Sequence, residues 1–277
     1  MSQPLFSIII ANYNHGKFLE EAILSVFGQS CQDFELIIVD GGSTDNSVEI
    51  IKKYADRLAW WCSEKDKGQS DAFNKGFAHA KGFFGCWLNA DDLMMPHALQ
   101  AVKKYLETHP DAAWIGGSMI FCDSQMNVLW CSRCMRVISS FHRWLPGGIV
   151  NGPSSFFLLK KMRSVGGFDE GLFYTMDIDL WRKFFVNGLK LHHVKNYLWA
   201  FRVHAQSKTS HRIANKPLPA FHQEGIRVNE KHGCSQRKVR FGTIVMRLAK
   251  FISGVYLWSF IDTRKYKGKP ITFSFQA

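Results

Sequence analysis

The first hundred residues alternate short apolar runs with amphipathic stretches. Leu5–Ala11 predicts a buried strand, and Lys17–Phe27 predicts a helix whose apolar residues recur on one face. The same alternation continues through three further apolar runs that we interpret as strands, at Phe34–Val39, Leu58–Cys62 and Phe83–Leu88. Strands separated by helices of this length are typical of βαβ units. We therefore expect an α/β fold with a mostly parallel central sheet flanked by helices.

The second half of the chain is less regular and ends in helical sequence. Strands are predicted at Trp114–Cys122, Val128–Cys131, Ser155–Leu159 and His192–Val203, with a helix at Asp177–Asn187 between the last two. After the last strand, the pattern predicts a helix at Pro217–Lys231 and an amphipathic basic stretch from Lys238 to about Phe260. We therefore divide the chain into an α/β domain, residues 1–213, and a helical basic C-terminal extension, residues 214–277.

The positive charge is concentrated in that extension. The formal net charge of the chain is +12, and the segment from Lys231 to Ala277 holds ten basic residues against one acid, Asp262. Its aromatic residues are interleaved with aliphatic ones, a pattern that favours an anionic membrane surface over nucleic acid. We expect peripheral membrane contact through residues 238–269 and no nucleic-acid partner. Packing of this helix on its own domain or on a dimer partner is the alternative.

Cysteine usage and the N-terminal sequence bear on the cellular compartment. The seven cysteines show no disulfide framework, and the pair Cys131 and Cys134 lacks a second ligand pair for zinc. The N-terminus has no signal-peptide pattern, and no uncharged run reaches the roughly 20 apolar residues that span a bilayer. We expect a cytoplasmic protein, with the inner face of the cytoplasmic membrane as a further expectation.

Polar and acidic residues follow four of the predicted strands. They are Asn12 to Asn14, Asp40, Ser63 to Asp66, and Asn89 with Asp91 and Asp92. Ligands of open parallel sheets bind where the carboxyl ends of the strands meet. The adjacent acids Asp91 and Asp92 repel each other unless a cation lies between them, and Mg²⁺ or Mn²⁺ prefers such oxygen ligands and shares them with phosphates. Helix capping is the alternative, but it does not account for the whole set.

Two further positions are candidates for chemistry. Asp177 and Asp179 stand two residues apart at the start of a predicted helix, so they point in different directions. We interpret Asp179 as a helix cap and Asp177 as a general base for an acceptor hydroxyl, with capping by both as the alternative. His204 follows the last strand of the domain, where a metal or phosphate role competes with a purely structural one.

Five motifs, taken in their order along the chain, resemble those of glycosyltransferase family 2. They are Ser7 to Asn14, Val39 to Asp45, Gly68 to Gly76, Trp87 to Asp92, and Gly166 to Glu170 with Met176 to Trp181. The resemblance implies a GT-A fold, a nucleotide-diphosphate-sugar donor and an inverting single displacement. It places Ala11, Tyr13 and Asp40 in the nucleobase pocket, joined by Asp66 or Asp71.

The same resemblance assigns residues to the metal site and to the catalytic base. Asp91 and Asp92 match a DxD-type motif that holds ribose, diphosphate and metal, with Asp92 as the direct ligand. Asp177 falls on the catalytic base, and His204 matches a histidine close to the diphosphate or metal. The cofactor implied is Mg²⁺ or Mn²⁺, and the favoured donor is a UDP-sugar. The acceptor implied is a saccharide or a lipid-linked saccharide.

The chain departs from the commoner family pattern at Gly41, Phe73 and Asn89, where acids or an arginine are usual. These variants resemble a subgroup that includes envelope and capsular polysaccharide enzymes. The QxxRW motif of processive synthases is absent, so we expect one sugar per encounter. A catalytically inactive sugar-nucleotide binder is the first alternative. A sugar nucleotidyltransferase is the second, although the loop after the first strand lacks the Gly-rich, basic sequence it would need.

Overall fold

The computed structural model describes residues 3–135, 152–205, 207 and 219–271. The strands are β1 (Phe6–Asn12), β2 (Phe34–Asp40), β3 (Trp60–Ser63), β4 (Phe84–Asn89), β5 (Leu93–Met94), β6 (Trp114–Cys122), β7 (Val128–Ser132), β8 (Ser155–Leu158) and β9 (His192–Arg202). The helices are α1 (Gly16–Phe27), α2 (Ser47–Lys53), α3 (Gln69–His79), α4 (Ala98–Thr108), α5 (Leu159–Ser164), α6 (Met176–Val186), α8 (Pro219–Lys231), α9 (Gln236–Ile252) and α10 (Val255–Tyr266).

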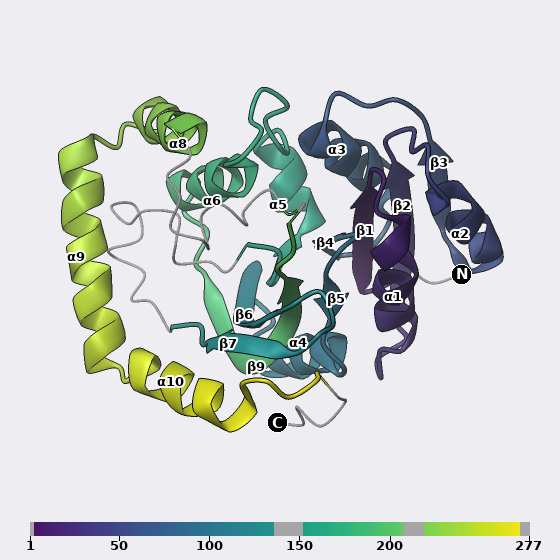
Figure 1. Cartoon of the computed structure of the whole chain (residues 1–277). Coiled ribbons are helices and arrows are strands. Elements are labelled where there is room, and N and C mark those ends of the chain that lie inside the picture. The colour runs from purple at the N-terminus through teal and green to yellow at the C-terminus, as the bar shows by residue number, and fades with distance from the viewer. Residues whose placement is uncertain (1–2, 136–151, 206, 208–218, 272–277) are drawn as a thin grey trace.

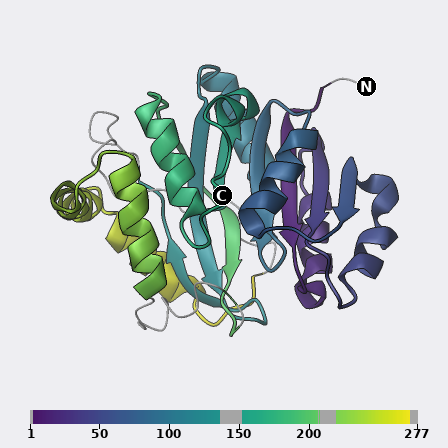
Figure 2. The ribbon, with the colours of Figure 1, turned by 90° about the horizontal axis from the view of Figure 1, so that it is seen from above.

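The strands form one sheet in the order β3-β2-β1-β4-β8-β6-β9-β5, with β7 beside β6 (Figures 1 and 2). Strand β1 pairs in parallel with both β2 and β4, and β6 pairs in parallel with β9. Strand β8 joins β4 and β6 by shorter antiparallel pairings. This confirms the predicted α/β fold with a mostly parallel sheet flanked by helices. In the register, Asn12 pairs with Asp40 and Ala11 with Asn89, so the polar strand ends lie along one edge.

Two apolar clusters cover the two faces of the sheet. Ile8 and Ile10 of β1 pack in the cluster that includes Leu19 of α1, whereas Ile9 between them packs in the cluster that includes Phe73 of α3. This alternation follows from the two-residue period of a strand. An uninterrupted run of apolar residues in β1 is therefore required, because both faces are covered.

Helix α6, which carries Asp177, is fixed to the sheet by stacked indoles. The ring of Trp181 stacks on Trp87 at 5.4 Å and on Trp114 at 4.9 Å between centroids, and all three side chains are buried. Phe73 joins the same cluster, 5.8 Å from the ring of Trp87. The replacement of the family's usual arginine by Phe73 is therefore a packing feature, because this side chain is fully buried.

The interpretation of Asp179 as a helix cap is wrong. Helix α6 starts after Thr175 without a side-chain cap, and the buried carboxylate of Asp179 faces cations instead. It lies 3.0 Å from the Nζ atoms of Lys183 and Lys231 and 2.8 Å from Nε2 of His232. Because Lys231 ends α8, this carboxylate ties α8 to α6.

We expect Asp179→Asn to lower the free energy of unfolding by about 3 kcal/mol, because it weakens the charge-assisted bonds that Lys183, Lys231 and His232 make to a fully buried carboxylate. Burial alone would raise the pKa of Asp179, but the bonds from His232, Lys231 and Lys183 outweigh it and lower the pKa below its usual range. A depressed folded pKa contributes stability above the unfolded value of about 3.9, and this contribution is lost as the pH falls through the folded value. The difference between wild type and variant should therefore shrink below about pH 4.

Urea unfolding at pH 7 and at pH 3 measures this effect. The exposed Asp111 supplies the control, since Asp111→Asn should change stability by less than about 0.5 kcal/mol. Equal urea midpoints for wild type and Asp179→Asn at pH 7 would contradict the assignment of the carboxylate as the link between α6 and α8.

The basic stretch predicted from Lys238 to Phe260 is two helices rather than one. Gly254, with φ of 71°, separates α9 from α10, and the helices bend by 63° at this point. Asp262 accepts hydrogen bonds from Arg133 Nε at 2.6 Å and Nη2 at 3.0 Å and from the hydroxyl of Tyr197, so α10 is held against β7 and β9. In the described part of the chain, no single helix is long and apolar enough to cross a bilayer; α9 and α10 pass that test only together.

The predicted boundary between the α/β domain and the extension, at residues 213 and 214, lies outside the described residues. The division therefore stays a prediction. Helix α9 lies at the outer edge of the molecule, beyond α6 and α8, and α10 continues along the lower edge in the view of Figure 1.

Candidate active site

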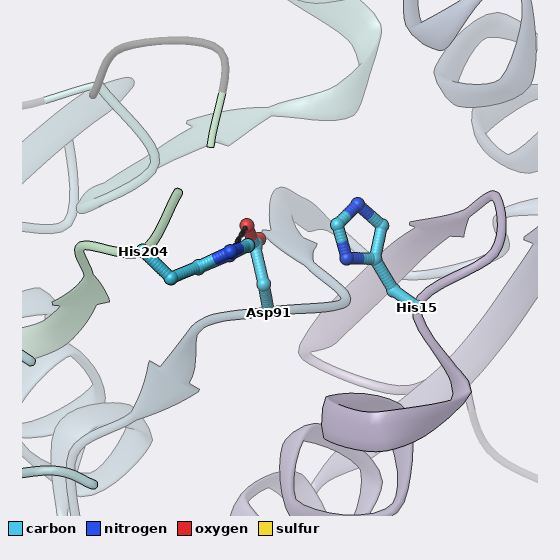
Figure 3. A group of neighbouring side chains, drawn as sticks. All are labelled: His15, Asp91 and His204. Carbon is cyan, nitrogen blue, oxygen red and sulfur yellow. Dashed lines mark hydrogen bonds and ion pairs between the residues drawn. The ribbon is translucent and has the colours of Figure 1, made fainter. Parts of the chain in front are cut away.

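Three side chains from distant parts of the sequence meet at the edge where the strands end. Asp91 follows β4, His204 follows β9, and His15 immediately precedes α1. The Nε2 atom of His204 lies 2.9 Å from Oδ2 of Asp91, and one ligand atom from each of the three residues lies within 4.8 Å of the others. In the view of Figure 3 the Asp91 carboxylate lies between the two imidazole rings. The fold therefore brings together Asp91 and His204, two residues that the sequence analysis had singled out separately.

Local backbone contacts position both histidines. The carbonyl of His15 accepts the N–H groups of Phe18 and Leu19 at 2.9 and 3.0 Å, which fixes His15 at the start of α1. His204 sits in a turn closed by Ser207, whose N–H donates to the His204 carbonyl at 3.0 Å. The ring of Phe18 lies 4.8 Å from that of His204 and gives the site an apolar wall.

His15 was not predicted as a site residue. Its Nδ1 atom is buried and has no hydrogen-bond partner among the residues that the structure describes. The signal in the sequence was its place in the loop after the first strand, one of the four polar strand ends. Two imidazole nitrogens and one carboxylate are a suitable ligand set for a divalent transition cation such as Mn²⁺, and they are less suited to Mg²⁺.

Asp92 points away from this cluster. Its side chain is 1% exposed and accepts hydrogen bonds from Asn89 Nδ2 at 2.8 Å, Arg202 N at 2.9 Å and Trp199 Nε1 at 3.3 Å. Burial, followed by the charge of Asp91, raises the pKa of Asp92 well above its usual range, although these three bonds oppose the shift. The geometry therefore favours Asp91 over Asp92 as the direct metal ligand, in contrast to our expectation.

Asn89 explains one departure from the family pattern. Its Nδ2 donates to Asp92, and its Oδ1 accepts from Gln69 Nε2 at 2.9 Å. A carboxylate at this position would present an oxygen to the Asp92 carboxylate within hydrogen-bond distance, where like charges repel. Asn89 thus orients the loop after β4 through a hydrogen bond that an aspartate could not donate.

Asp40 is the most completely bonded acid at the strand ends. It is fully buried and accepts hydrogen bonds from Asn12 Nδ2 at 2.6 Å, Ser43 N at 2.9 Å and Ser63 Oγ at 2.7 Å. Burial by itself would raise the pKa of Asp40, but bonds from Ser43, Ser63 and Asn12 outweigh it and lower the pKa. The carboxylate therefore joins the loops after β1, β2 and β3 into one platform.

Gly41, where the family's commoner pattern has a second acid, leaves room for Asp66. A Cβ atom on Gly41 would lie 2.6 Å from Oδ2 of Asp66, whose other oxygen accepts from Gly68 N at 2.8 Å. The carboxylate of Asp66 thus lies beside the place where a side chain on Gly41 would begin. Asp71 is more enclosed, and its Oδ2 accepts from Lys67 N at 3.0 Å and pairs with Lys75 at 3.5 Å.

Of the remaining predicted residues, Ala11 and Tyr13 belong to the same edge, whereas Asp177 belongs to helix α6. Ala11 is part of β1 and partly buried against the cluster of Ile9, whereas Tyr13 in the following loop is 59% exposed. Asp177 is the second residue of α6, where its Oδ1 accepts from Ile178 N at 2.8 Å. On the side of its Oδ2 stands Gly152, where an added Cβ would lie 3.6 Å away.

Sequence comparison identifies the family. The model described as "Glycosyl transferase family 2" matches residues 7–162. An uncharacterised glycosyltransferase of Methanocaldococcus jannaschii is 26% identical over 286 residues, which cover 98% of this chain and 97% of the relative. The putative glycosyltransferase EpsE of Bacillus subtilis is 29% identical, over 73% of this chain and 74% of EpsE.

Solved structures agree on the fold. Residues 1–349 of S. aureus TarS in complex with UDP-GlcNAc align with a TM-score of 0.58 at 16% identity, over 80% of this chain and 65% of that one. The mannosyltransferase PcManGT of Pyrobaculum calidifontis, in complex with GDP-Man and Mn²⁺, aligns with a TM-score of 0.59 at 16% identity, over 95% of this chain and 85% of that one. The chain is therefore a glycosyltransferase of GT-A type that belongs to glycosyl transferase family 2.

Proposed function

We propose that this enzyme moves one sugar from a nucleotide-diphosphate sugar to a hydroxyl acceptor, with inversion at the anomeric carbon. The observation that carries the proposal is the meeting of Asp91, His204 and His15 at the edge that also holds Asp40. A nucleotide-diphosphate sugar needs both a surface that binds its nucleobase and a site that offsets the negative charge of its diphosphate. The Asp40 platform would take the nucleoside, with Ala11, Tyr13 and Asp66 or Asp71 around it.

The three-residue cluster would hold a divalent cation, and a transition cation such as Mn²⁺ is preferred over Mg²⁺ because two ligands are imidazoles. When bound, the cation offsets the charge that develops on the departing diphosphate. Asp91 supplies the negative charge of the site, while His204 and His15 approach it from separate loops. Asp92 fixes the direction of the loop through Arg202 and Trp199.

Asp177 is proposed as the general base. In a single displacement, the acceptor hydroxyl would give its proton to Oδ2 of Asp177 while its oxygen forms the new bond to the anomeric carbon. The bond between that carbon and the diphosphate oxygen breaks, and its electron pair leaves with the diphosphate. The hydrogen bond from Ile178 N to Oδ1 holds the carboxylate in one orientation, and the glycine at 152 keeps side-chain bulk away from Oδ2.

The donor is proposed to be a UDP-sugar, and the acceptor a saccharide or lipid-linked saccharide of cell-envelope or capsular polysaccharide synthesis. TarS binds UDP-GlcNAc and PcManGT binds GDP-Man, so UDP-sugars and GDP-sugars both merit testing as donors. An inactive sugar-nucleotide binder was suggested by Gly41, Phe73 and Asn89. Each of these residues has a structural explanation here, in Asp66, the aromatic core and Asp92.

An assay of nucleoside diphosphate release tests the proposal. UDP-, GDP- and dTDP-sugars are incubated with the enzyme, with Mn²⁺ or with a chelator, and released diphosphate and free or transferred sugar are quantified. We expect release from one donor, dependent on Mn²⁺. Binding of a donor without turnover under any condition would favour the inactive binder, and consumption of nucleoside triphosphate with sugar phosphate would favour a nucleotidyltransferase.

Membrane contact is proposed for the C-terminal elbow, defined as α9 and α10 (residues 236–266). Large apolar side chains are exposed along both helices, namely Phe241, Ile244, Leu248, Phe251, Ile252, Tyr256, Leu257, Trp258 and Phe260. The elbow also carries seven basic residues and one acid, Asp262, which Arg133 already neutralises. Apolar and basic side chains together suit the headgroup region of an anionic membrane, and a second copy would bring like charge. This would place the enzyme at the cytoplasmic face, beside a lipid-linked acceptor.

We expect the double variant Phe251→Ser with Ile252→Ser to bind anionic vesicles at least about tenfold more weakly. Those side chains are 75% and 83% exposed, and burial of each in the membrane interface contributes about 1.5–3 kcal/mol. Co-sedimentation with phosphatidylcholine vesicles, with and without phosphatidylglycerol, measures the effect. Leu24→Ser with Phe83→Ser, two exposed apolar residues elsewhere, is the matched control.

Two outcomes of this measurement would contradict membrane contact through the elbow. Equal binding of wild type and double variant to anionic vesicles would exclude the elbow as the contact. A wild-type dimer that the double variant loses, without any vesicle binding, would assign the surface to a second copy.

A further inference from the structure

Arg182 is a buried cation that the proposed reaction does not use. It lies in α6 with 2% of its side chain exposed, and its Nη2 donates to Asn229 Oδ1 at 2.9 Å. Its Nε and Nη1 atoms are also buried, and neither has a hydrogen-bond partner among residues 3–135, 152–205, 207 and 219–271. A buried donor without an acceptor is costly, so these groups point to a partner that the described part of the chain does not supply.

The charge of Arg182 also lacks a carboxylate among the described residues. The acid nearest in sequence, Asp179, is already surrounded by Lys183, Lys231 and His232. Burial lowers the pKa of Arg182, and only the thiol of Cys234 opposes this shift. An unpaired guanidinium inside a protein is unfavourable unless an anion lies beside it.

Arg182 lines a cavity with space for such an anion. The cavity has a volume of about 280 Å³ and lies between the second half of α6, the end of α8 and the start of α9. His232 and Lys238 add polar and basic groups, whereas Phe185 and Val186 form an apolar side. Lys238 belongs to the first turn of α9, where the helix dipole favours negative charge.

We infer that this cavity binds a small oxyanion of the phosphate class. Arg182 would donate to it from inside the protein, and Lys238 from the rim. The occupant could be free phosphate or the phosphate of a lipid headgroup, since α9 is the first helix of the proposed membrane-binding elbow. In either case the anion would join α9 to α6, and so fix the elbow to the helix that carries Asp177.

Titration of wild-type protein with inorganic phosphate tests the site without any substitution. Calorimetry and thermal unfolding are carried out at constant ionic strength, with chloride replacing phosphate in the reference. We expect saturable binding and a rise in melting temperature with phosphate that chloride does not produce. Equal effects of phosphate and chloride would overturn the inference.

Substitution of the cation then locates the site. Arg182→Met should weaken phosphate binding by about tenfold or more, because a charge-assisted hydrogen bond contributes about 1.5–3 kcal/mol. Arg182→Lys, which keeps the charge, should retain part of the affinity. Arg240→Met, at an exposed arginine of α9, is the control and should bind like wild type. Undiminished phosphate binding by Arg182→Met would show that phosphate binds elsewhere.

Vesicles distinguish the two sources of the anion. If a headgroup fills the cavity, Arg182→Met should reduce binding to phosphatidic acid vesicles, and inorganic phosphate should compete with them. If free phosphate fills it, vesicle binding should be the same for both proteins while phosphate still raises the wild-type melting temperature. These readouts do not use sugar transfer, so they stand or fall separately from the proposed enzymatic function.

Discussion

Asp177→Asn should reduce sugar transfer by about 10²–10⁴-fold while the affinity for the nucleotide donor stays within about twofold of wild type. Asparagine matches the shape of aspartate and can still occupy the first turn of α6, but it cannot accept a proton at neutral pH. Turnover and donor dissociation constant are measured on the same preparations. The separation of the two effects is the informative result, because a folding defect would change both.

Two controls sharpen this prediction. Asp111→Asn, at an exposed position, should leave both turnover and donor affinity unchanged. Asp179→Asn in the same helix should lower stability, with a smaller effect on turnover at a temperature where the protein is folded. If Asp177→Asn transfers sugar at the wild-type rate, another group is the base and the proposed displacement must be reassigned.

Asp91→Asn should reduce metal-dependent transfer by about 10²–10³-fold, because it removes the negative charge of the proposed cation site. The concentration of Mn²⁺ needed for half-maximal rate should rise as well. His204→Ala and His15→Ala should each raise that concentration by about tenfold, since each removes one neutral ligand. Initial rates over a Mn²⁺ series, for the wild type and the three variants, give both quantities.

Asp92→Asn provides the contrast for Asp91. Its carboxylate accepts from three N–H donors inside the protein, so the substitution should mainly lower the melting temperature. An increased requirement for Mn²⁺ in Asp92→Asn, with no such change in Asp91→Asn, would restore Asp92 as the direct ligand.

The order of strands and helices was predictable because both faces of the sheet are covered. The apolar run of β1 and the amphipathic repeat of α1 therefore appear directly in the sequence. The two-residue strand β5 (Leu93–Met94) was missed, since a pattern needs more residues to show a period. The break at Gly254 was missed because the residues on both sides continue the same apolar and basic composition.

The candidate site was predicted as a set of strand ends but not in its details. Asp91 and Asp92 share one turn, and the sequence cannot show which of them faces His204. That choice depends on Arg202 and Trp199 of β9, more than a hundred residues away along the chain. His15 and the pairing of Asp179 with α8 are likewise long-range contacts, which no local pattern encodes.

Binding of the diphosphate product with and without metal tests the central claim most directly. Calorimetric titration of UDP and GDP into the wild type and Asp91→Asn, each with Mn²⁺ or with a chelator, gives the coupling between metal and nucleotide. We predict that Mn²⁺ tightens wild-type binding of one nucleotide by at least about tenfold, and that Asp91→Asn loses this gain. Equal affinity with Mn²⁺ and with chelator in the wild type would contradict a metal-assisted site at Asp91, His204 and His15.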